Sequence, residues 1–425
     1  YTLYSFILTL GAVITLPYWL FQAVRRRKYL KNFRQRLGFG LPQWDDPRSS
    51  LWIHAVSVGE VLAAKPLMTA LRRQHPQIPL IVSTVTLTGQ ALAAKELTEA
   101  RACFFFPFDW SFCVRRFLAR FRPRAVVLLE TEVWPNFIRG CALTGVPVFL
   151  ANGRISDRSA GRYRWLRGFF KNVLMSVAAV GVQSTEDRKR FEDMGAASRR
   201  IHVTGNLKFD FPPPETGEAI PLLRQIRDHL GAAEGSPVIV IGSSMKGEEP
   251  LFVGAYGEIL HRLPQARLVL APRHPERFDE VERIVAQARI PYLRRSLLAQ
   301  NRPGEARILI LDSIGELRSV YSLASITVIG GSFSPHGGHN LLEPASWGKA
   351  IVFGPYMSNF REAARLFLRE QAARQCTPET LPEVLTELLV NDGARSILGR
   401  RALLTLQQNQ GATAATLAFL RPALE

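Results

Sequence analysis

Short apolar runs alternate with helix-like segments along most of the chain, and this alternation restricts the fold more than any other feature. Before residue 210 the runs are 51–57, 80–85, 125–130, 146–151, 179–183 and 201–205. Most of their residues are apolar, as in parallel strands that helices cover on both faces. The pattern therefore predicts an α/β domain built on a parallel sheet.

A proline-rich stretch, 211–214 followed by Pro221, separates these runs from a second series. That series comprises 238–242, 266–272, 307–312, 326–331 and 350–354. A chain of 425 residues is also longer than one hydrophobic core usually supports. We expect two facing Rossmann-like domains, at 51–210 and 222–425, with a linker at 211–221 and a cleft between the domains. The last helix could pack back on the first domain.

The N-terminal segment predicts a membrane anchor. Residues 1–24 carry no ionisable side chain except tyrosine, and about 1.5 Å per residue makes this run long enough to cross a bilayer. Seven cations stand at the start of the basic juxtamembrane segment 25–50: Arg25, Arg26, Arg27, Lys28, Lys31, Arg34 and Arg36. The positive-inside rule then places the remaining chain in the cytoplasm, at the inner membrane. A buried N-terminal helix is the alternative.

The charge balance predicts anionic partners. The chain has 54 Lys and Arg against 36 Asp and Glu, a formal charge of +18. Nucleic acid, an anionic membrane surface and phosphorylated substrates are all compatible with this excess. We expect the membrane surface and the substrates, and no nucleic acid, because no nucleic-acid-binding motif occurs and an anchor opposes that function. The four cysteines lack CxxC spacing, so neither disulfides nor a zinc site is predicted.

Ligands of parallel α/β sheets bind beyond the carboxyl ends of the strands, so the residues that follow each strand are the candidate site. Glu60 comes soon after the first strand, in Ser57-x-x-Glu60. The spacing fits a capping box, in which Glu60 would only bind the Ser57 backbone. It equally fits a general base that takes a proton from a substrate hydroxyl. Both interpretations stay open here.

Two more carboxylates, Glu130 and Glu132, stand at the end of the third predicted strand, before a Trp-Pro pair. They would share one side of the strand if it continued that far. A functional acidic site and a salt-bridged rim are both compatible with this pattern. A metal-binding Asp-x-Asp is absent from the predicted domains, and only His336 and His339 have a paired histidine spacing. We therefore expect no metal ion and no other cofactor.

Strand ends of the second domain suit a nucleotide. Ser243 follows the first strand, and Arg273 and His274 follow the next. Arg273 could offer its forked donors to a phosphate or carboxylate, or could be an ordinary surface arginine.

A glycine-rich loop, 330–340, follows a later strand of the same domain and contains Gly337 and Gly338. Glycines let backbone amides approach an anion, and a helix N-terminus favours negative charge. Asn340 and Glu343 have capping-box spacing, which is the structural alternative. The position of the loop indicates a nucleotide phosphate site.

A basic and aromatic segment, 153–174, lies in the first domain. Arg162 and Arg164 alternate there with Tyr163 and Trp165. The mixture fits an interfacial element whose arginines bind the phosphates of a lipid, so both arginines are candidate acceptor-binding residues. An ordinary helix with Trp165 and Phe169 in the core is the alternative.

Several motifs occur in a defined order along the chain. They are Ser57-x-Gly59-Glu60, Glu130-Thr131-Glu132-x-Trp134-Pro135-Asn136, Gly205-Asn206-Leu207-Lys208-Phe209-Asp210, Pro272-Arg273-His274 and His336-Gly337-Gly338-His339-Asn340-x-x-Glu343-Pro344. Together they resemble the 3-deoxy-D-manno-octulosonic acid (Kdo) transferases of lipopolysaccharide synthesis, over nearly the whole chain. The resemblance implies a GT-B fold, CMP-Kdo as donor and the tetra-acylated lipid A precursor, lipid IVA, as acceptor. It also implies inversion at the anomeric carbon without a metal ion.

The resemblance also implies residue roles. Glu60 would be the general base, and Glu130 would belong to the second acidic motif of the catalytic site. Glu132 would contact the acceptor. The nucleotide would be held by Ser243, Arg273, His274, Gly337, Gly338, Asn340 and Glu343. One departure is Met245, where relatives often have a histidine.

Two other functions remain compatible with the residues alone. A GT-B transferase or epimerase that uses another nucleotide sugar would share the loop around Asn340. A membrane-bound nucleotide-sugar sensor would need no general base, so Glu60 in a complete acceptor domain argues against that class.

Overall fold

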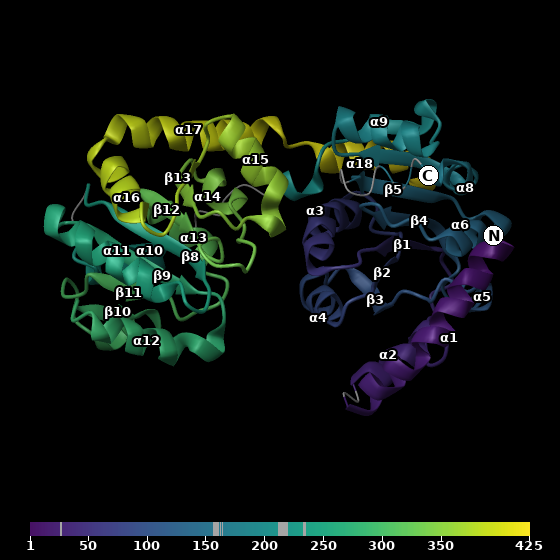
Figure 1. Cartoon of the computed structure of the whole chain (residues 1–425), viewed down its shortest axis with the longest axis horizontal. Helices are drawn as coiled ribbons and strands as arrows, with labels where there is room; N and C mark the ends of the chain where they lie inside the picture. The colour runs from purple at the N-terminus through teal and green to yellow at the C-terminus, as the bar shows by residue number, and fades with distance from the viewer. Residues whose placement is uncertain (26–27, 156–160, 162, 164, 211–219, 233–234) are drawn as a thin grey trace. The chain divides into compact units, whose positions relative to one another are not determined.

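The computed structural model describes residues 1–25, 28–155, 161, 163, 165–210, 220–232 and 235–425, and only the backbone within 16–31. The chain forms two compact units, 1–210 with 409–425 and 211–408. Helix α18 (Ala412–Leu424), yellow in Figure 1, belongs to the first unit, where it packs against α3 (Val58–Gln74). Most of the expected linker, 211–219, lies outside the described residues.

The first unit is built on one parallel sheet with the strand order β3-β2-β1-β4-β5-β6-β7. Its elements before α18 are α1 (Thr2–Arg25), α2 (Lys28–Arg36), β1 (Ser50–His54), α3, β2 (Leu80–Thr84), α4 (Leu87–Glu96), β3 (Ala100–Phe105), α5 (Ser111–Phe121), β4 (Pro123–Leu129), α6 (Pro135–Leu143), β5 (Val148–Gly153), α8 (Arg167–Leu174), β6 (Val177–Val182), α9 (Thr185–Met194), η1 (Ser198–Arg200), β7 (Ile201–Val203) and η2 (Leu207–Phe209).

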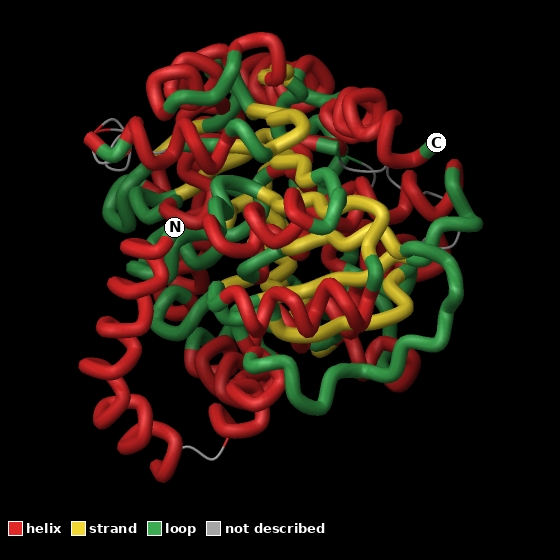
Figure 2. Tube along the Cα trace, turned by 90° about the vertical axis from the view of Figure 1, so that its right-hand side faces the viewer, coloured by secondary structure: helices red, strands yellow, loops and turns green. Residues whose placement is uncertain are grey.

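Residues of β1 show why both faces of this sheet are covered. Leu51 and Ile53 are fully buried in a core shared with α3, α4 and α18. Trp52 points to the other face and is fully buried among aromatic residues such as Phe104 and Phe137. Successive side chains of a strand alternate between the faces, so a strand covered on both sides needs an unbroken apolar run. Figure 2 shows strands, in yellow, enclosed by helices, in red.

The second unit has a parallel sheet with the strand order β10-β11-β9-β8-β12-β13-β14. Its elements are α10 (Ile220–His229), β8 (Val238–Ser244), α11 (Glu249–Arg262), β9 (Arg267–Pro272), η3 (Pro275–Arg277), α12 (Phe278–Gln287), β10 (Tyr292–Arg294), η4 (Arg295–Gln300), β11 (Ile308–Ile310), α13 (Leu317–Val320), η5 (Tyr321–Leu323), β12 (Ile326–Ile329), α14 (Leu342–Ser346), β13 (Ala350–Phe353), η6 (Ser358–Phe360), α15 (Arg361–Arg369), β14 (Arg374–Gln375), α16 (Leu381–Val390) and α17 (Asp392–Gln408).

Every strand predicted from an apolar run is present, and the two-domain α/β prediction is confirmed. The strands β3, β10 and β14 were not predicted from the sequence, and all three are edge strands. An edge strand has a single partner and more contact with water, so polar residues interrupt its apolar run. Arg101 of β3 is exposed, for example, as are both residues of β14.

Each sheet has one switch point, a pair of adjacent strands from which the chain continues toward opposite edges of the sheet. These points lie between β1 and β4 in the first unit and between β8 and β12 in the second. Loops at the carboxyl ends of such strands diverge and leave a crevice for ligands. Glu60 and Glu130 follow β1 and β4, whereas Ser243 and the 330–340 loop stand at the ends of β8 and β12.

Helix α1 carries the segment for which an anchor over residues 1–24 is expected. No helix within the described part of the chain is both long and apolar enough to span a bilayer. The start of α1 contacts the first unit, where the Tyr4 hydroxyl donates to an Asp109 carboxylate oxygen at 2.9 Å. Tyr4 also stacks on Phe169, with 5.8 Å between the ring centroids.

Candidate active site

Glu60 lies in the first turn of α3 and is 6% exposed. One carboxylate oxygen accepts a hydrogen bond from the Val56 backbone N–H at 2.7 Å, and the other accepts from the Ser57 hydroxyl at 2.9 Å. The Ser57 side chain makes no capping hydrogen bond to the helix backbone. The motif is therefore not a reciprocal capping box: Glu60 binds the chain just before the helix.

The surroundings of Glu60 favour its protonated form. Burial, with added repulsion from the carboxylates of Glu130 and Glu132, raises its pKa to about 7, although the hydrogen bonds from Val56 and Ser57 oppose this rise. A carboxylate with a pKa near neutrality exchanges a proton readily at physiological pH, as a general base must. The same interactions show that the three predicted carboxylates lie near one another.

Glu130 directly follows β4, and a cation faces it. Its carboxylate accepts from the Lys208 ammonium group at 3.0 Å, and both side chains are about one quarter exposed. The backbone of Glu130 is in the left-handed region, at φ 56°. The strand therefore ends at Leu129 instead of continuing to Glu132. Left-handed residues other than glycine are uncommon and concentrate at functional sites.

Lys208 is a site residue for which no role was predicted from the sequence, although it belongs to the motif at 205–210. Its position depends on Asn152, whose side-chain oxygen accepts from the Leu207 backbone N–H at 3.0 Å. Asn152 is fully buried and is also left-handed, at φ 58°. Lys208 also approaches the start of α3, because a Cβ atom added to Gly59 would lie 3.8 Å from its ammonium nitrogen. The start of α3, the end of β4 and the 3-10 helix η2 therefore lie close together.

Glu132, the first predicted acceptor-binding residue, lies in the loop between β4 and α6. Burial raises its pKa to about 7, and the neighbouring Trp134 side chain partly offsets this effect. The other two predicted acceptor-binding residues, Arg162 and Arg164, are outside the described residues. Nearby, Trp165 is 84% exposed, whereas Phe169 is partly buried against the core. An ordinary helix with Trp165 in the core is therefore excluded.

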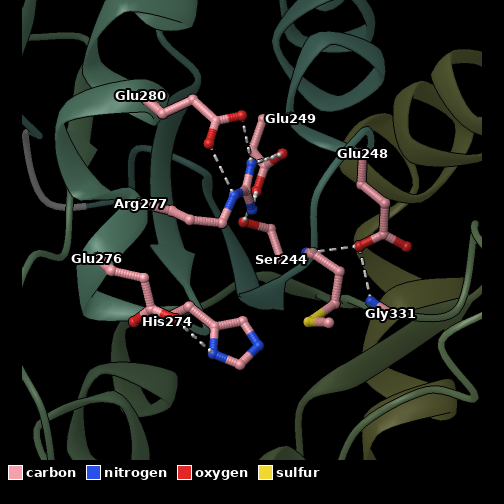
Figure 3. Close-up of polar contacts among 9 residues, drawn as sticks. Ser244, Glu248, Glu249, His274, Glu276, Arg277, Glu280 and Gly331 are labelled. Carbon is pink, nitrogen blue, oxygen red and sulfur yellow. Dashed lines mark hydrogen bonds and ion pairs between the residues drawn. The ribbon is translucent and has the colours of Figure 1, made fainter. Parts of the chain in front are cut away.

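In the second unit, Glu248 joins the loops that follow β8 and β12. Its buried carboxylate accepts from the backbone N–H groups of Met245 at 2.9 Å, Gly331 at 2.7 Å and Phe333 at 2.9 Å. Figure 3 shows the contact with Gly331. A carboxylate that binds backbone amides of two loops holds them in one arrangement. Glu248 was not among the site residues predicted from the sequence.

Glu249 and Arg277 form a buried ion pair beside Glu248. The guanidinium group binds both carboxylate oxygens, at 2.8 and 3.0 Å, and Glu280 completes its partners (Figure 3). The Ser244 hydroxyl donates to Glu249 at 2.9 Å. These bonds join the ends of β8 and β9, and so support the neighbouring Arg273 backbone, which donates to the Ser244 carbonyl oxygen at 3.0 Å.

The predicted nucleotide-binding residues Ser243, Arg273 and His274 lie at these strand ends. Ser243 is left-handed, at φ 60°, and half-buried. Arg273 is exposed. The His274 ring nitrogen lies 3.7 Å from a Glu276 carboxylate oxygen (Figure 3). Arg273 is therefore the more accessible donor for an anion.

Gly337 and Gly338 lie against the segment that follows β13. Both have positive φ, 91° and 71°. A Cβ atom would approach Asn359 to 2.7 Å at Gly337 and Met357 to 2.3 Å at Gly338. These glycines are therefore required by left-handed backbone and close packing, in addition to any contact with a ligand.

Asn340 and Glu343 contact each other at the end of the same loop. The Asn340 amide group donates to Glu343 at 3.2 Å, and its oxygen accepts from the Leu342 N–H at 3.0 Å. Glu343 does not form the capping box considered for it, because its partner is a side chain. Burial raises its pKa, whereas Asn340, Arg318 and Arg273 lower it. Arg273 and Glu343 are therefore close enough to interact.

Two parallel α/β units, with acidic residues at one switch point and an anion-compatible loop at the other, are the architecture of a GT-B-like protein that acts on a nucleotide-linked substrate. The family model described as "3-Deoxy-D-manno-octulosonic-acid transferase (kdotransferase)" matches residues 31–211. Two curated 3-deoxy-D-manno-octulosonic acid transferases, 30% and 35% identical, extend the similarity over 95% and 86% of the chain. The protein belongs to the Kdo transferase family.

Two curated relatives show that this chain belongs to the Kdo transferase family. The 3-deoxy-D-manno-octulosonic acid transferase of Haemophilus influenzae is 30% identical over 408 residues, 95% of this chain and 94% of that protein. The enzyme of the same name from Bordetella pertussis is 35% identical over 381 residues, 86% of each chain. A UDP-GlcNAc 2-epimerase structure from Neisseria meningitidis has a TM-score of 0.55 and covers 88% of this chain and 100% of its own. At 12% identity it shows the shared fold alone.

Proposed function

We propose that this glycosyltransferase moves Kdo from CMP-Kdo to the lipid A precursor, lipid IVA, in lipopolysaccharide biosynthesis. Transfer occurs with inversion at the anomeric carbon and without a metal ion. The observation that carries the mechanism is Glu60, a buried carboxylate with a pKa near 7 at a sheet switch point. Its distinguishing feature is that it is poised to accept a proton at neutral pH.

In the proposed reaction, Glu60 takes the proton of an acceptor hydroxyl while the hydroxyl oxygen attacks the anomeric carbon of Kdo. The bond from that carbon to the phosphate oxygen breaks, and its electron pair leaves with CMP. A single displacement of this kind inverts the anomeric centre. Glu130 and Lys208 form an ion pair that orients groups beside the base. Lys208 also offers a positive charge to the negative charge that develops during transfer.

The second unit is proposed to bind CMP. Arg273 pairs with the phosphate, and Glu343 accepts from ribose hydroxyls while Asn340 orients it. Ser243, His274 and the backbone of Gly337 and Gly338 form the remaining contacts. Arginine is suited to this role because its forked donors match a phosphate. Glu248 acts indirectly, by holding the loops in place.

The acceptor is proposed to reach the first unit from the cytoplasmic face of the inner membrane. Contact with a lipid surface is supported by Trp165, which is exposed, and by the exposed apolar residues of α1. The residues of α1 are Leu3, Phe6, Ile7, Leu10, Val13 and Ile14. The +18 formal charge favours anionic lipids. Glu132, Arg162 and Arg164 are proposed to contact the acceptor headgroup.

One experiment tests donor and acceptor together. Purified full-length enzyme is incubated with lipid IVA and CMP-Kdo, and the products are weighed by mass spectrometry. We expect lipid IVA with added Kdo, together with CMP. A parallel reaction with UDP-GlcNAc tests the alternative donor class, and transfer or epimerisation of that sugar with no use of CMP-Kdo would refute the proposal.

A further inference from the structure

A cavity of about 530 Å³ lies in the second unit, where the loops after β12 and β13 meet α15. Pro335 and Gly337 contribute to one wall, and Tyr356 and Met357 contribute to another. This volume is in the usual range for small-molecule sites, about 300–1,000 Å³. The cavity is therefore large enough for a sugar.

Cations line one side of the cavity without a counter-charge. Arg361 and Arg365 are four residues apart on α15, so they stand on the same face of the helix. Both are exposed, and neither has a hydrogen bond or ion pair within the described part of the chain. No acidic side chain among the described residues lines the cavity. It thus combines two unneutralised guanidinium groups with an apolar wall.

The cavity is continuous with the candidate nucleotide loop. Gly337 lines it, and the Gly337 carbonyl oxygen accepts from the Asn359 backbone N–H at 2.8 Å. The Asn359 side chain also donates to the His336 carbonyl oxygen at 3.0 Å. The glycine loop and the segment between β13 and α15 are therefore held together, and a nucleotide on the loop would have the cavity beside it.

We infer that this cavity is the subsite for the sugar acid of the donor, with Arg361 and Arg365 binding its carboxylate. The inference rests on the proposed function, since it assumes a donor whose sugar carries a carboxylate. Two guanidinium groups match a carboxylate in charge and in hydrogen-bond geometry. Tyr356, which is 46% exposed, offers an aromatic face to the carbon skeleton of the sugar. The specificity for an acidic sugar thus comes from α15.

The test uses the R361Q/R365Q double variant of the full-length enzyme. Steady-state kinetics give KM for CMP-Kdo and for lipid IVA, and calorimetry gives the Kd of CMP, which lacks the sugar. We expect KM for CMP-Kdo to rise tenfold or more, the scale of losing charge-assisted hydrogen bonds, with the Kd of CMP unchanged. R369Q is the matched control, because Arg369 is on the same helix, outside the cavity, and paired with Glu370.

Four results would overturn the assignment. An unchanged KM for CMP-Kdo would remove the arginines from the site, and an equal weakening of CMP would assign them to the nucleotide. A raised KM for lipid IVA alone would show that they bind a lipid phosphate. Calorimetry also measures the Kd of free Kdo and of its methyl ester for the wild-type enzyme. This measurement needs no turnover, so it tests the carboxylate subsite even if the proposed transfer reaction is wrong. Equal affinity for acid and ester would refute a carboxylate subsite.

Discussion

Glu60 occupies a position that is useful for catalysis and unfavourable for a charge. It is almost fully buried near two other carboxylates, and its pKa of about 7 reflects that environment. Because this value is above the ordinary 4.5, the folded protein takes up a proton between these two pH values. The charged carboxylate thus costs stability above pH 7, and the cost is relieved as the pH falls.

We predict that E60Q lowers kcat by about 100-fold or more, since removal of a general base usually costs 10²–10⁴-fold. In the wild type, kcat/KM should fall tenfold per pH unit below about 7, where Glu60 becomes protonated. The variant should lose this dependence. The melting temperature of E60Q minus that of the wild type should be larger at pH 8.5 than at pH 5.5, because the wild type carries the buried charge only at the higher pH. A variant that unfolds early but turns over normally when folded would restrict Glu60 to a structural role.

Gly242 is required by its contact with a buried tyrosine. A Cβ atom there would lie 1.9 Å from the Tyr321 hydroxyl oxygen, and Tyr321 is 2% exposed. We predict that G242A destabilises the protein by about 1–3 kcal/mol through overpacking. G254A is the control, because Gly254 is exposed on α11 with no atom within 4 Å and should gain about 0.5–1 kcal/mol. Denaturant unfolding measures both, and equal effects would contradict the prediction.

Among the structural elements, the strand ends carry both the candidate chemistry and the unusual backbone. Glu130, Asn152 and Ser243 are all left-handed where β4, β5 and β8 end. Such backbone is maintained only when neighbouring contacts determine it, as the Asn152–Leu207 and Glu130–Lys208 contacts do. The loops are therefore set by tertiary contacts, whereas the strands follow from local apolar runs.

Glu248 gives a test of loop positioning. We predict that E248Q weakens CMP binding about tenfold, because an amide cannot accept from all three backbone donors, and charge-assisted bonds are lost. Calorimetry with CMP measures this change. E258Q is the control, since Glu258 is an exposed carboxylate on α11, the helix that follows Glu248. Unchanged CMP affinity in E248Q would show that its contacts do not support the nucleotide site.

At the scale of the whole molecule, the positive charge and exposed apolar residues predict binding to anionic membranes. The full-length protein should sediment with vesicles that contain phosphatidylglycerol, and less so as NaCl rises from about 50 to about 500 mM, because salt screens the attraction. Phosphatidylcholine vesicles are the control for charge. W165S should weaken binding while leaving the Kd of CMP unchanged, since Trp165 is exposed on the first unit. Binding independent of both lipid charge and salt would contradict an electrostatic contribution.

The proposed independence of metal ions is tested on the intact enzyme. We expect activity to be retained after treatment with EDTA and exchange into metal-free buffer, because Lys208 and Arg273 supply the positive charges in the proposed mechanism. Readdition of Mg²⁺, Mn²⁺ or Zn²⁺ should leave kcat unchanged. Activity that disappears with EDTA and returns with one ion would contradict this prediction.

The sequence by itself determined the two parallel sheets, their central strands and the segments that carry the candidate site. These features depend on neighbours in the chain: apolar runs for buried strands, and polar or glycine residues directly after them. The tertiary structure decided which distant groups meet. Lys208 reaches Glu130 from 78 positions away, and Glu248 binds Gly331 across 83, because strand order brings their loops together. It also decided the edge strands β3, β10 and β14, since one-sided pairing leaves little apolar pattern to detect.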